Sequence, residues 1–169
     1  MKHLLIVIVL FFASFSLWSF EYAGVGLGPD IRLSGERPSN FFVQGEWQPH
    51  KVVGTRVFFG FNNGFWVGVA INFRANIAKI GHGTIWDANL SIPFIFNTRL
   101  NSRVAFIGAT VGTTVSFDID GKHHHYFFLT PIDILYTPLN WIMYPASGGG
   151  ANRDGSVSLM CSAGLRFAI

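Results

Sequence analysis

The sequence predicts an all-β protein, an antiparallel up-and-down transmembrane β-barrel of about eight strands whose lumen is filled by small and polar side chains. Three observations lead to this prediction. Apolar and polar residues alternate along most of the chain, and half of the 169 residues are hydrophobic while only 12% are charged. Beyond residue 20, no apolar run reaches the ~20 residues that a membrane helix requires. Such a chain can cross a membrane only with strands.

The N-terminus is expected to direct export. Lys2 is followed by an apolar stretch from Leu4 to Phe20 that contains no acid and no glycine. This layout is typical of a secretory signal, and we assign residues 1–19 to it, with the cleavage position left open and an uncleaved anchor helix as the alternative. Residues 20–169 are then long enough for a single domain, the barrel.

The clearest alternation lies at the C-terminus, where every second residue is apolar and those between are small or polar, apart from Met160. Because successive side chains of a strand point to opposite faces, this segment predicts a strand with one apolar face. That face comprises Val157, Leu159, Cys161, Ala163, Leu165, Phe167 and Ile169.

The other strands are predicted from the same pattern. A hairpin is indicated where two alternating segments flank Asn62, Asn63 and Gly64. Three prolines interrupt the alternation between Tyr126 and Tyr144 or just beyond it, so the strand count there is left open. The expected strands are 22–33, 41–48, 53–61, 65–74, 84–96, 103–120, 124–136 and 156–169, and breaks are expected at 34–40, 48–51, 76–83, 97–102, 120–121 and 147–155.

The composition of the polar face indicates whether water or lipid surrounds the barrel. A soluble barrel buries its apolar face and presents many charged residues to water. Here the polar face consists mainly of Gly, Ser, Thr, Asn and Ala, as at Gly24, Gly26 and Gly28. This composition favours a narrow lumen, with the apolar face turned toward lipid.

A few charged residues occupy positions on the polar face of the strands and are therefore predicted to point into the lumen. Four are acidic and three are arginines, so a paired network that plugs and stiffens the barrel is expected, with a polar pathway or binding site as the alternative. These residues are Glu46, Arg56, Arg74, Asp87, Asp118, Asp133 and Arg166.

The signal segment, the short alternating strands and the terminal pattern from Val157 to Ile169 resemble the small bacterial outer-membrane β-barrels, including the OmpA transmembrane-domain, OmpX and OmpW groups. The resemblance implies a location in the bacterial outer membrane, among its lipids. It also implies that the barrel-assembly machinery recognises the terminal strand, which in these families usually ends in an aromatic residue. This chain ends in Ile169 instead, with Phe167 two positions earlier.

Other functional classes find little support. The 12 Lys and Arg residues are scattered, so nucleic-acid binding is not expected. The single cysteine, Cys161, excludes an internal disulfide. His123 and His125 could chelate together but lack a well-placed third ligand, so no metal or cofactor is predicted. No G-x-S-x-G motif is present, and the nearest catalytic constellation is His82-Gly83-Thr84 with Asp87.

We therefore expect a non-enzymatic outer-membrane barrel with a structural, surface-interaction or small-solute permeation role. The glycine-rich segment 147–155 is the expected site for a surface ligand. Two alternatives stay open. One is a lipid-modifying barrel enzyme, which would share this architecture, and the other is a soluble secreted barrel that binds an apolar ligand.

Overall fold

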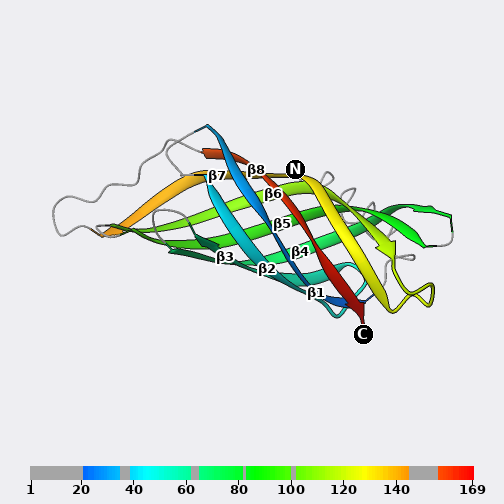
Figure 1. Ribbon diagram of the computed structural model, residues 1–169. Helices are drawn as coiled ribbons and strands as arrows, with labels where there is room; N and C mark the ends of the chain where they lie inside the picture. Colours follow the sequence, from blue (N-terminus) through cyan, green and yellow to red (C-terminus); the bar gives the residue numbers. More distant parts are fainter. Residues whose placement is uncertain (1–20, 35–38, 62–64, 82, 100–101, 145–155) are drawn as a thin grey trace.

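The computed structural model describes residues 21–34, 39–61, 65–81, 83–99, 102–144 and 156–169, and gives only the backbone for 97–99, 102–106 and 139–144. Eight strands form a closed barrel in which each strand pairs antiparallel with the next and the last pairs with the first (Figure 1). The predicted fold class is thereby confirmed. The strands are β1 (Tyr22–Ser34), β2 (Asn40–Gln48), β3 (Val53–Phe61), β4 (Phe65–Ile80), β5 (Thr84–Arg99), β6 (Ser102–Asp118), β7 (His125–Tyr144) and β8 (Ser156–Ala168).

Two strands, β4 and β7, extend well beyond the ranges that the sequence predicts. The break expected at 76–83 shrinks to a short turn, because a bulge between Asn76 and Ala78 lets β4 continue. Likewise β7 continues through Pro131 and Pro138, with a shift in register where it passes the first of them. A bulge removes the need for a backbone donor at the proline, so pairing resumes beyond it. The strand count that the prolines left open is eight.

The barrel has two distinct ends. The turns after β2, β4 and β6 lie at the end that carries Tyr22 and Ala168, here called the terminal end. Strands β1, β3, β5 and β7 finish at the opposite end, here called the loop end. No helix in the described ranges is long and apolar enough to cross a membrane.

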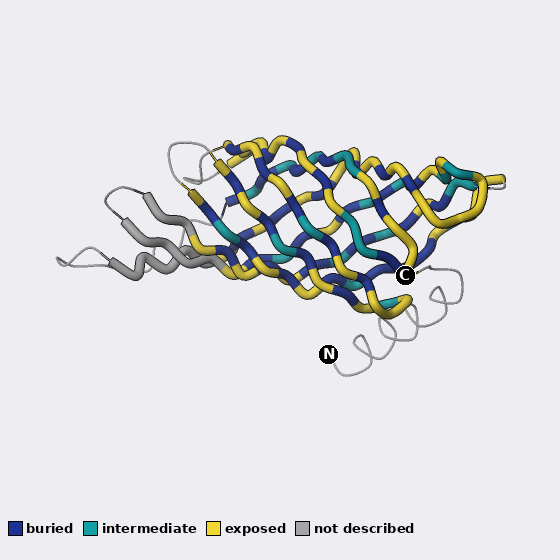
Figure 2. The backbone as a smooth tube through the Cα atoms, turned by 60° about the horizontal axis from the view of Figure 1, so that its bottom comes forward, coloured by how far each residue is buried: buried dark blue, intermediate teal, exposed yellow. Residues whose placement is uncertain are grey.

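Along the strands, buried and exposed residues alternate (Figure 2). The outward residues are aliphatic or aromatic, and several expose half of their surface, such as Leu27 (54%), Ile71 (52%) and Val111 (61%). The inward face contains nearly all of the buried polar and charged residues. The structure therefore has an apolar exterior and a polar interior.

The lumen also contains an apolar cluster, on the loop-end side of most of its charges. Its rings pack closely, with 6.1 Å between the ring centres of Phe42 and Phe58 and 6.2 Å between those of Phe58 and Trp66. Gly60 leaves room for the indole, because a Cβ there would lie 1.6 Å from Nε1 of Trp66. We call this set the lumen cluster, and it comprises Phe42, Phe58, Trp66, Ala70, Ile95, Leu135 and Met160.

Candidate functional site: a charge network in the lumen

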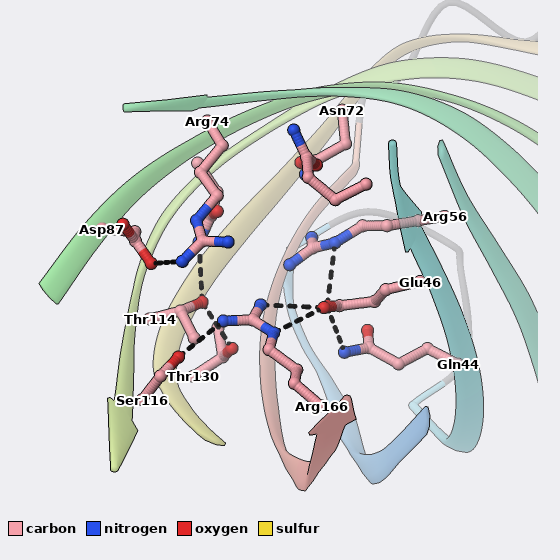
Figure 3. A network of polar contacts seen from close by, with 12 residues as sticks. Gln44, Glu46, Arg56, Asn72, Arg74, Asp87, Thr114, Ser116, Thr130 and Arg166 are labelled. Atoms are coloured by element: carbon pink, nitrogen blue, oxygen red, sulfur yellow. Dashed lines mark hydrogen bonds and ion pairs between the residues drawn. The ribbon is translucent and has the colours of Figure 1, made fainter. Parts of the chain in front are cut away.

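Glu46 on β2 is the centre of the lumen network (Figure 3). Nε and Nη2 of Arg166 donate hydrogen bonds to its Oε2, at 2.9 and 2.8 Å. Nε2 of Gln44 donates to its Oε1 at 3.0 Å, and Nε of Arg56 lies 3.4 Å from the same oxygen. One carboxylate thus holds two guanidinium groups, from β3 and from β8.

Both arginines extend the network across the barrel. Nη1 of Arg56 donates to Oδ2 of Asp133 on β7 at 2.8 Å, and Nη1 of Arg166 donates to Oγ of Ser116 on β6 at 2.8 Å. Together with Glu46, these side chains join five strands, β2, β3, β6, β7 and β8, through the interior. A network anchored on so many strands resists any change in the barrel's cross-section.

A separate ion pair joins β4 to β5. Nη2 of Arg74 donates to Oδ2 of Asp87, and Nδ2 of Asn76 donates to the other carboxylate oxygen at 3.2 Å. Next to this pair, Asn89 donates to Thr114 at 2.7 Å, and the Thr114 hydroxyl also shares a 2.8 Å hydrogen bond with that of Thr130. Polar contacts therefore continue around the β5, β6 and β7 side of the lumen.

Tyr22 connects the two charged groups. The guanidinium carbon of Arg166 lies 4.3 Å from the centre of its ring, and that of Arg74 lies 4.7 Å from it. Arg166 also lies 4.5 Å from the ring centre of Phe128, so its cation is placed between two aromatic faces. Cation–π contacts of this kind strengthen when water is excluded, and both Tyr22 and Phe128 are fully buried.

The charges in these two groups balance. Three arginines face three carboxylates, and none of the six side chains is more than 5% exposed. Burying an unpaired ion costs several kcal/mol, so the pairing is what makes this interior possible. The arrangement fills the lumen and fastens its walls together.

Six of the seven charged residues assigned to the lumen by parity lie in these two groups; Asp118 does not. Asp118 is the last residue of β6, and its carboxylate accepts backbone N–H bonds from Gly121 (3.0 Å) and His123 (3.2 Å). Its Oδ2 also lies 2.6 Å from Nδ1 of His123. Because the strand ends there, the side chain organises the turn to β7.

Asp30, Tyr22 and Gln44 are also buried in the interior, although they are not among the lumen residues predicted from the sequence. Alternation could have found Asp30 and Tyr22, which share the parity of the lumen-facing Gly24 and Gly28. Gln44 shares the parity of Glu46, but a search confined to charged residues passes over it.

The terminal strand closes the barrel between β7 and β1. Its apolar residues face outward as the alternation predicts, with Leu165, Phe167 and Ile169 the most exposed, at 42, 43 and 70%. The outward residues Val157, Leu159, Cys161 and Ala163 are partly covered. Recognition of this strand by assembly machinery stays a prediction.

His123, His124 and His125 lie at the terminal end, where β6 turns into β7. Nδ1 of His125 lies 2.9 Å from Oδ2 of Asp120, and this hydrogen bond holds the pKa of the Asp120 carboxyl well below its usual range. The three histidine side chains are 55 to 68% exposed. Within the described ranges, no group of three or more His, Cys, Asp or Glu residues could hold a metal ion.

The possible catalytic constellation is only partly described, since His82 lies outside the described residues. Asp87 points into the lumen and binds Arg74, whereas Thr84 has the parity of the outward-facing Trp86. The structure therefore places the hydroxyl and the carboxylate on opposite faces of β5.

No family model and no curated protein matches the sequence. Among solved structures, the N-terminal β-barrel domain of Pseudomonas aeruginosa OprF is similar, with 10% identity, a TM-score of 0.53, and coverage of 89% of this chain and 98% of that domain. Neisserial surface protein A (NspA) has 14% identity, a TM-score of 0.47, and coverage of 89% and 96%. The chain therefore has the fold of the small outer-membrane β-barrels.

Proposed function

We propose that this chain is an integral β-barrel of the bacterial outer membrane, with a structural and surface-interaction role and no catalytic activity. One observation carries the proposal, namely the apolar exterior around a charged interior. Fully burying one large apolar side chain is worth about 1.5–3 kcal/mol, so leaving a whole barrel face of them in water would be very costly. Lipid removes that cost, which argues against the soluble secreted barrel.

The contents of the lumen argue against free permeation through the barrel. The side chains of the charge network and of the lumen cluster are buried, and the two sets adjoin where Asp133 pairs with Met160 and Arg56 pairs with Ala70. An ion would have to separate several buried ion pairs and also pass the buried rings of the cluster. We therefore propose that the protein acts through the surfaces at its two ends and not through its lumen.

The loop end is the proposed interaction surface. The segment 147–155 lies outside the described residues, but β7 and β8, which it connects, place its two attachment points at the end opposite the termini. With the termini in the periplasm, as is usual for bacterial barrels with an even strand count, this connection faces the exterior. A surface ligand would bind there, while the outward face of β8 would serve the assembly machinery before insertion.

The side chains required for catalysis are dispersed. The carboxylates of Glu46, Asp87 and Asp133 bind arginines, and the described histidines lie at the terminal end, where Asp118 and Asp120 organise the β6–β7 turn. This dispersal supports a non-enzymatic role over lipid modification. Mass spectrometry of envelope lipids, with and without the protein, separates the two; a new acylated or deacylated lipid that depends on the protein would establish the enzyme.

Migration on gels tests the barrel itself. A closed barrel in detergent should keep its structure in unheated sample buffer and migrate differently from the boiled chain, and it should stay with membranes after carbonate extraction. Planar-bilayer recordings should show no large stable conductance. Identical migration before and after boiling, together with release into the aqueous phase, would refute membrane insertion.

A further inference from the structure

At the terminal end, β4 extends well beyond its neighbour β3. Pairing between the two strands ends at Val53 and Phe73. One further backbone hydrogen bond joins the N–H of Arg74 to the carbonyl of Val52, at 2.8 Å. Residues 75–80, here called the β4 extension, continue in a strand paired with β5. At about 3.3 Å per residue, these six residues reach roughly 20 Å further along the strand. Figure 1 shows the β4–β5 hairpin, in green, projecting at this end.

The β2–β3 turn, residues 49–52, does not accompany the β4 extension, because it is folded onto itself. Nε2 of Gln48 donates to the carbonyl of His50 at 2.7 Å, and the N–H of Val52 donates to Nδ1 of His50 at 3.3 Å. Along residues 75–78, β4 therefore faces no other described strand on its β3 side. This stretch is an open sheet edge, the kind of surface that can pair with a strand from another polypeptide.

The β4 extension is held in its extended form from the β5 side. Nδ2 of Asn76 donates to Asp87 on β5 at 3.2 Å. On the far side of β5, the N–H of Asp118 donates to the carbonyl of Gly83 at 2.8 Å, and the inward-facing Ile85 is only 4% exposed. The edge is thus formed before any partner arrives, which lowers the entropic cost of binding one.

Positive charge borders the edge. Lys51 in the β2–β3 turn and Lys79 on the β4 extension are both exposed. Neither the turn nor the extension contains an acid, whereas Asp118 and Asp120 organise the β6–β7 turn on the other side of the hairpin. Ile77, next to these charges, is 43% exposed. The edge therefore combines backbone groups with lysine and isoleucine side chains.

We propose that the β4 extension docks an acidic, extended segment of a periplasmic polypeptide, which adds to the sheet as a further strand beside β4. Backbone hydrogen bonds supply affinity in this mode of recognition, and alternate side chains supply specificity. Carboxylates of the partner would meet Lys51 and Lys79, and its apolar side chains would contact Ile77. The inference rests on the membrane insertion proposed above, which places the terminal end in the periplasm, where water surrounds the edge.

Two other occupants fit the edge less well. A second copy of this chain would bring the same lysines together, and exposed lysines on an edge strand are a common means of preventing such self-pairing. The hydrocarbon of the membrane does not suit the edge either, because an open edge in lipid leaves its backbone groups without partners.

Binding of short synthetic peptides to the folded protein in detergent tests the proposal. In the probe peptide, threonine alternates with residues that are in turn glutamate and valine, so that one face carries both carboxylates and apolar groups. One control peptide has lysine in place of each glutamate. Another has proline in place of each threonine, which keeps the charge but removes N–H groups that a strand must donate. Fluorescence anisotropy of the labelled peptides gives the affinities.

The same measurement on two variants locates the binding. Lys79→Glu reverses the charge on the β4 extension, and the matched control Lys122→Glu makes the same change in the β6–β7 turn at the same end. We expect the probe to bind at least about tenfold more tightly than either control peptide, and Lys79→Glu to weaken it about fivefold or more, with Lys122→Glu within about twofold of the unmodified protein.

The outcomes that would overturn the proposal are distinct. Equal binding of the proline peptide would refute strand addition, and equal weakening by the two variants would refute docking at the β4 extension. Absence of probe binding to a protein that shows heat-modifiable migration would refute the acidic partner, as would a dimer of this chain that the probe does not dissociate. Failure of the chain to insert into vesicles would instead refute the proposed function, without altering affinities measured in detergent.

Discussion

Arg166 binds a single carboxylate oxygen of Glu46 through two N–H groups, although 120 positions separate them in the sequence. Their strands, β8 and β2, are not neighbours, because β1 lies between them. At that level β1 carries Gly24, which pairs with both residues, and a Cβ there would lie 3.0 Å from Cγ of Arg166. The side chain of Arg166 on β8 thus reaches Glu46 on β2 across Gly24 of β1.

Replacing Arg166 by Met tests how much the Arg166–Glu46 ion pair stabilises the barrel. Breaking a buried ion pair from one side typically costs about 3–5 kcal/mol, because the remaining charge loses its partner. We expect a loss near the lower end of that range, since Arg56 still faces Glu46. Urea unfolding in lipid vesicles measures the change, with the exposed Lys51→Ala as a control. A loss no larger than that of the control would contradict a structural role for the pair.

The Arg74–Asp87 pair allows a complete double-mutant cycle. Asp87→Leu alone should destabilise the barrel by about 3 kcal/mol, because it leaves a buried guanidinium without its carboxylate. The double variant Arg74→Met/Asp87→Leu should recover most of that loss, since no charge remains unpaired. Additive losses in the two single variants and the double variant would show that the groups do not interact.

Two glycines should respond oppositely to the addition of one methyl group. A Cβ on Gly28 would lie 1.8 Å from the Cys161 carbonyl oxygen, whereas a Cβ on the outward Gly45 meets nothing within 4 Å. Gly28→Ala should therefore lower stability by about 1–3 kcal/mol, as overpacking does. Gly45→Ala should leave it within about 1 kcal/mol of the original or raise it. The readout is the temperature at which the folded band is lost on gels, and equal effects would refute the close approach.

The β6–β7 turn should confer acid sensitivity. Since the hydrogen bond from His125 depresses the pKa of Asp120 in the folded state, its stabilising contribution is present at neutral pH and is lost as the pH falls through that depressed value. Asp120→Asn should lower the urea midpoint at neutral pH, and the difference should shrink in strong acid. Glu21→Gln provides an exposed control. A difference that grows as the pH falls would contradict the assigned sign.

The fold could be predicted because side chains alternate with period two in every strand, whatever the register. For the same reason, the alternation predicts that the side chains of Glu46 and Arg166 point into the lumen. It does not predict their pairing, because the stagger between strands decides which inward residues meet, and that stagger is a property of the closed barrel. Nothing local therefore indicates that Arg166 would bind Glu46 rather than Asp133.

The remaining differences from prediction arise at strand ends and prolines. Asp118 has lumen parity, but β6 ends there and its carboxylate caps a turn. Pro131 interrupts pairing as expected, yet β7 continues beyond it through a bulge. The lumen cluster went unrecognised because Phe58 and Trp66 have the parity of small residues such as Gly60 and Gly68, and only the folded lumen shows how glycines make room for rings.

An epitope inserted at Gly149 and probed on intact cells tests the central claim most directly. An outer-membrane barrel with periplasmic termini should display this tag to antibody and to added protease without any permeabilisation, while a tag placed after Ile169 should stay protected. Detection of the Gly149 tag only after the outer membrane is breached, or recovery of the protein in the soluble fraction, would contradict the account.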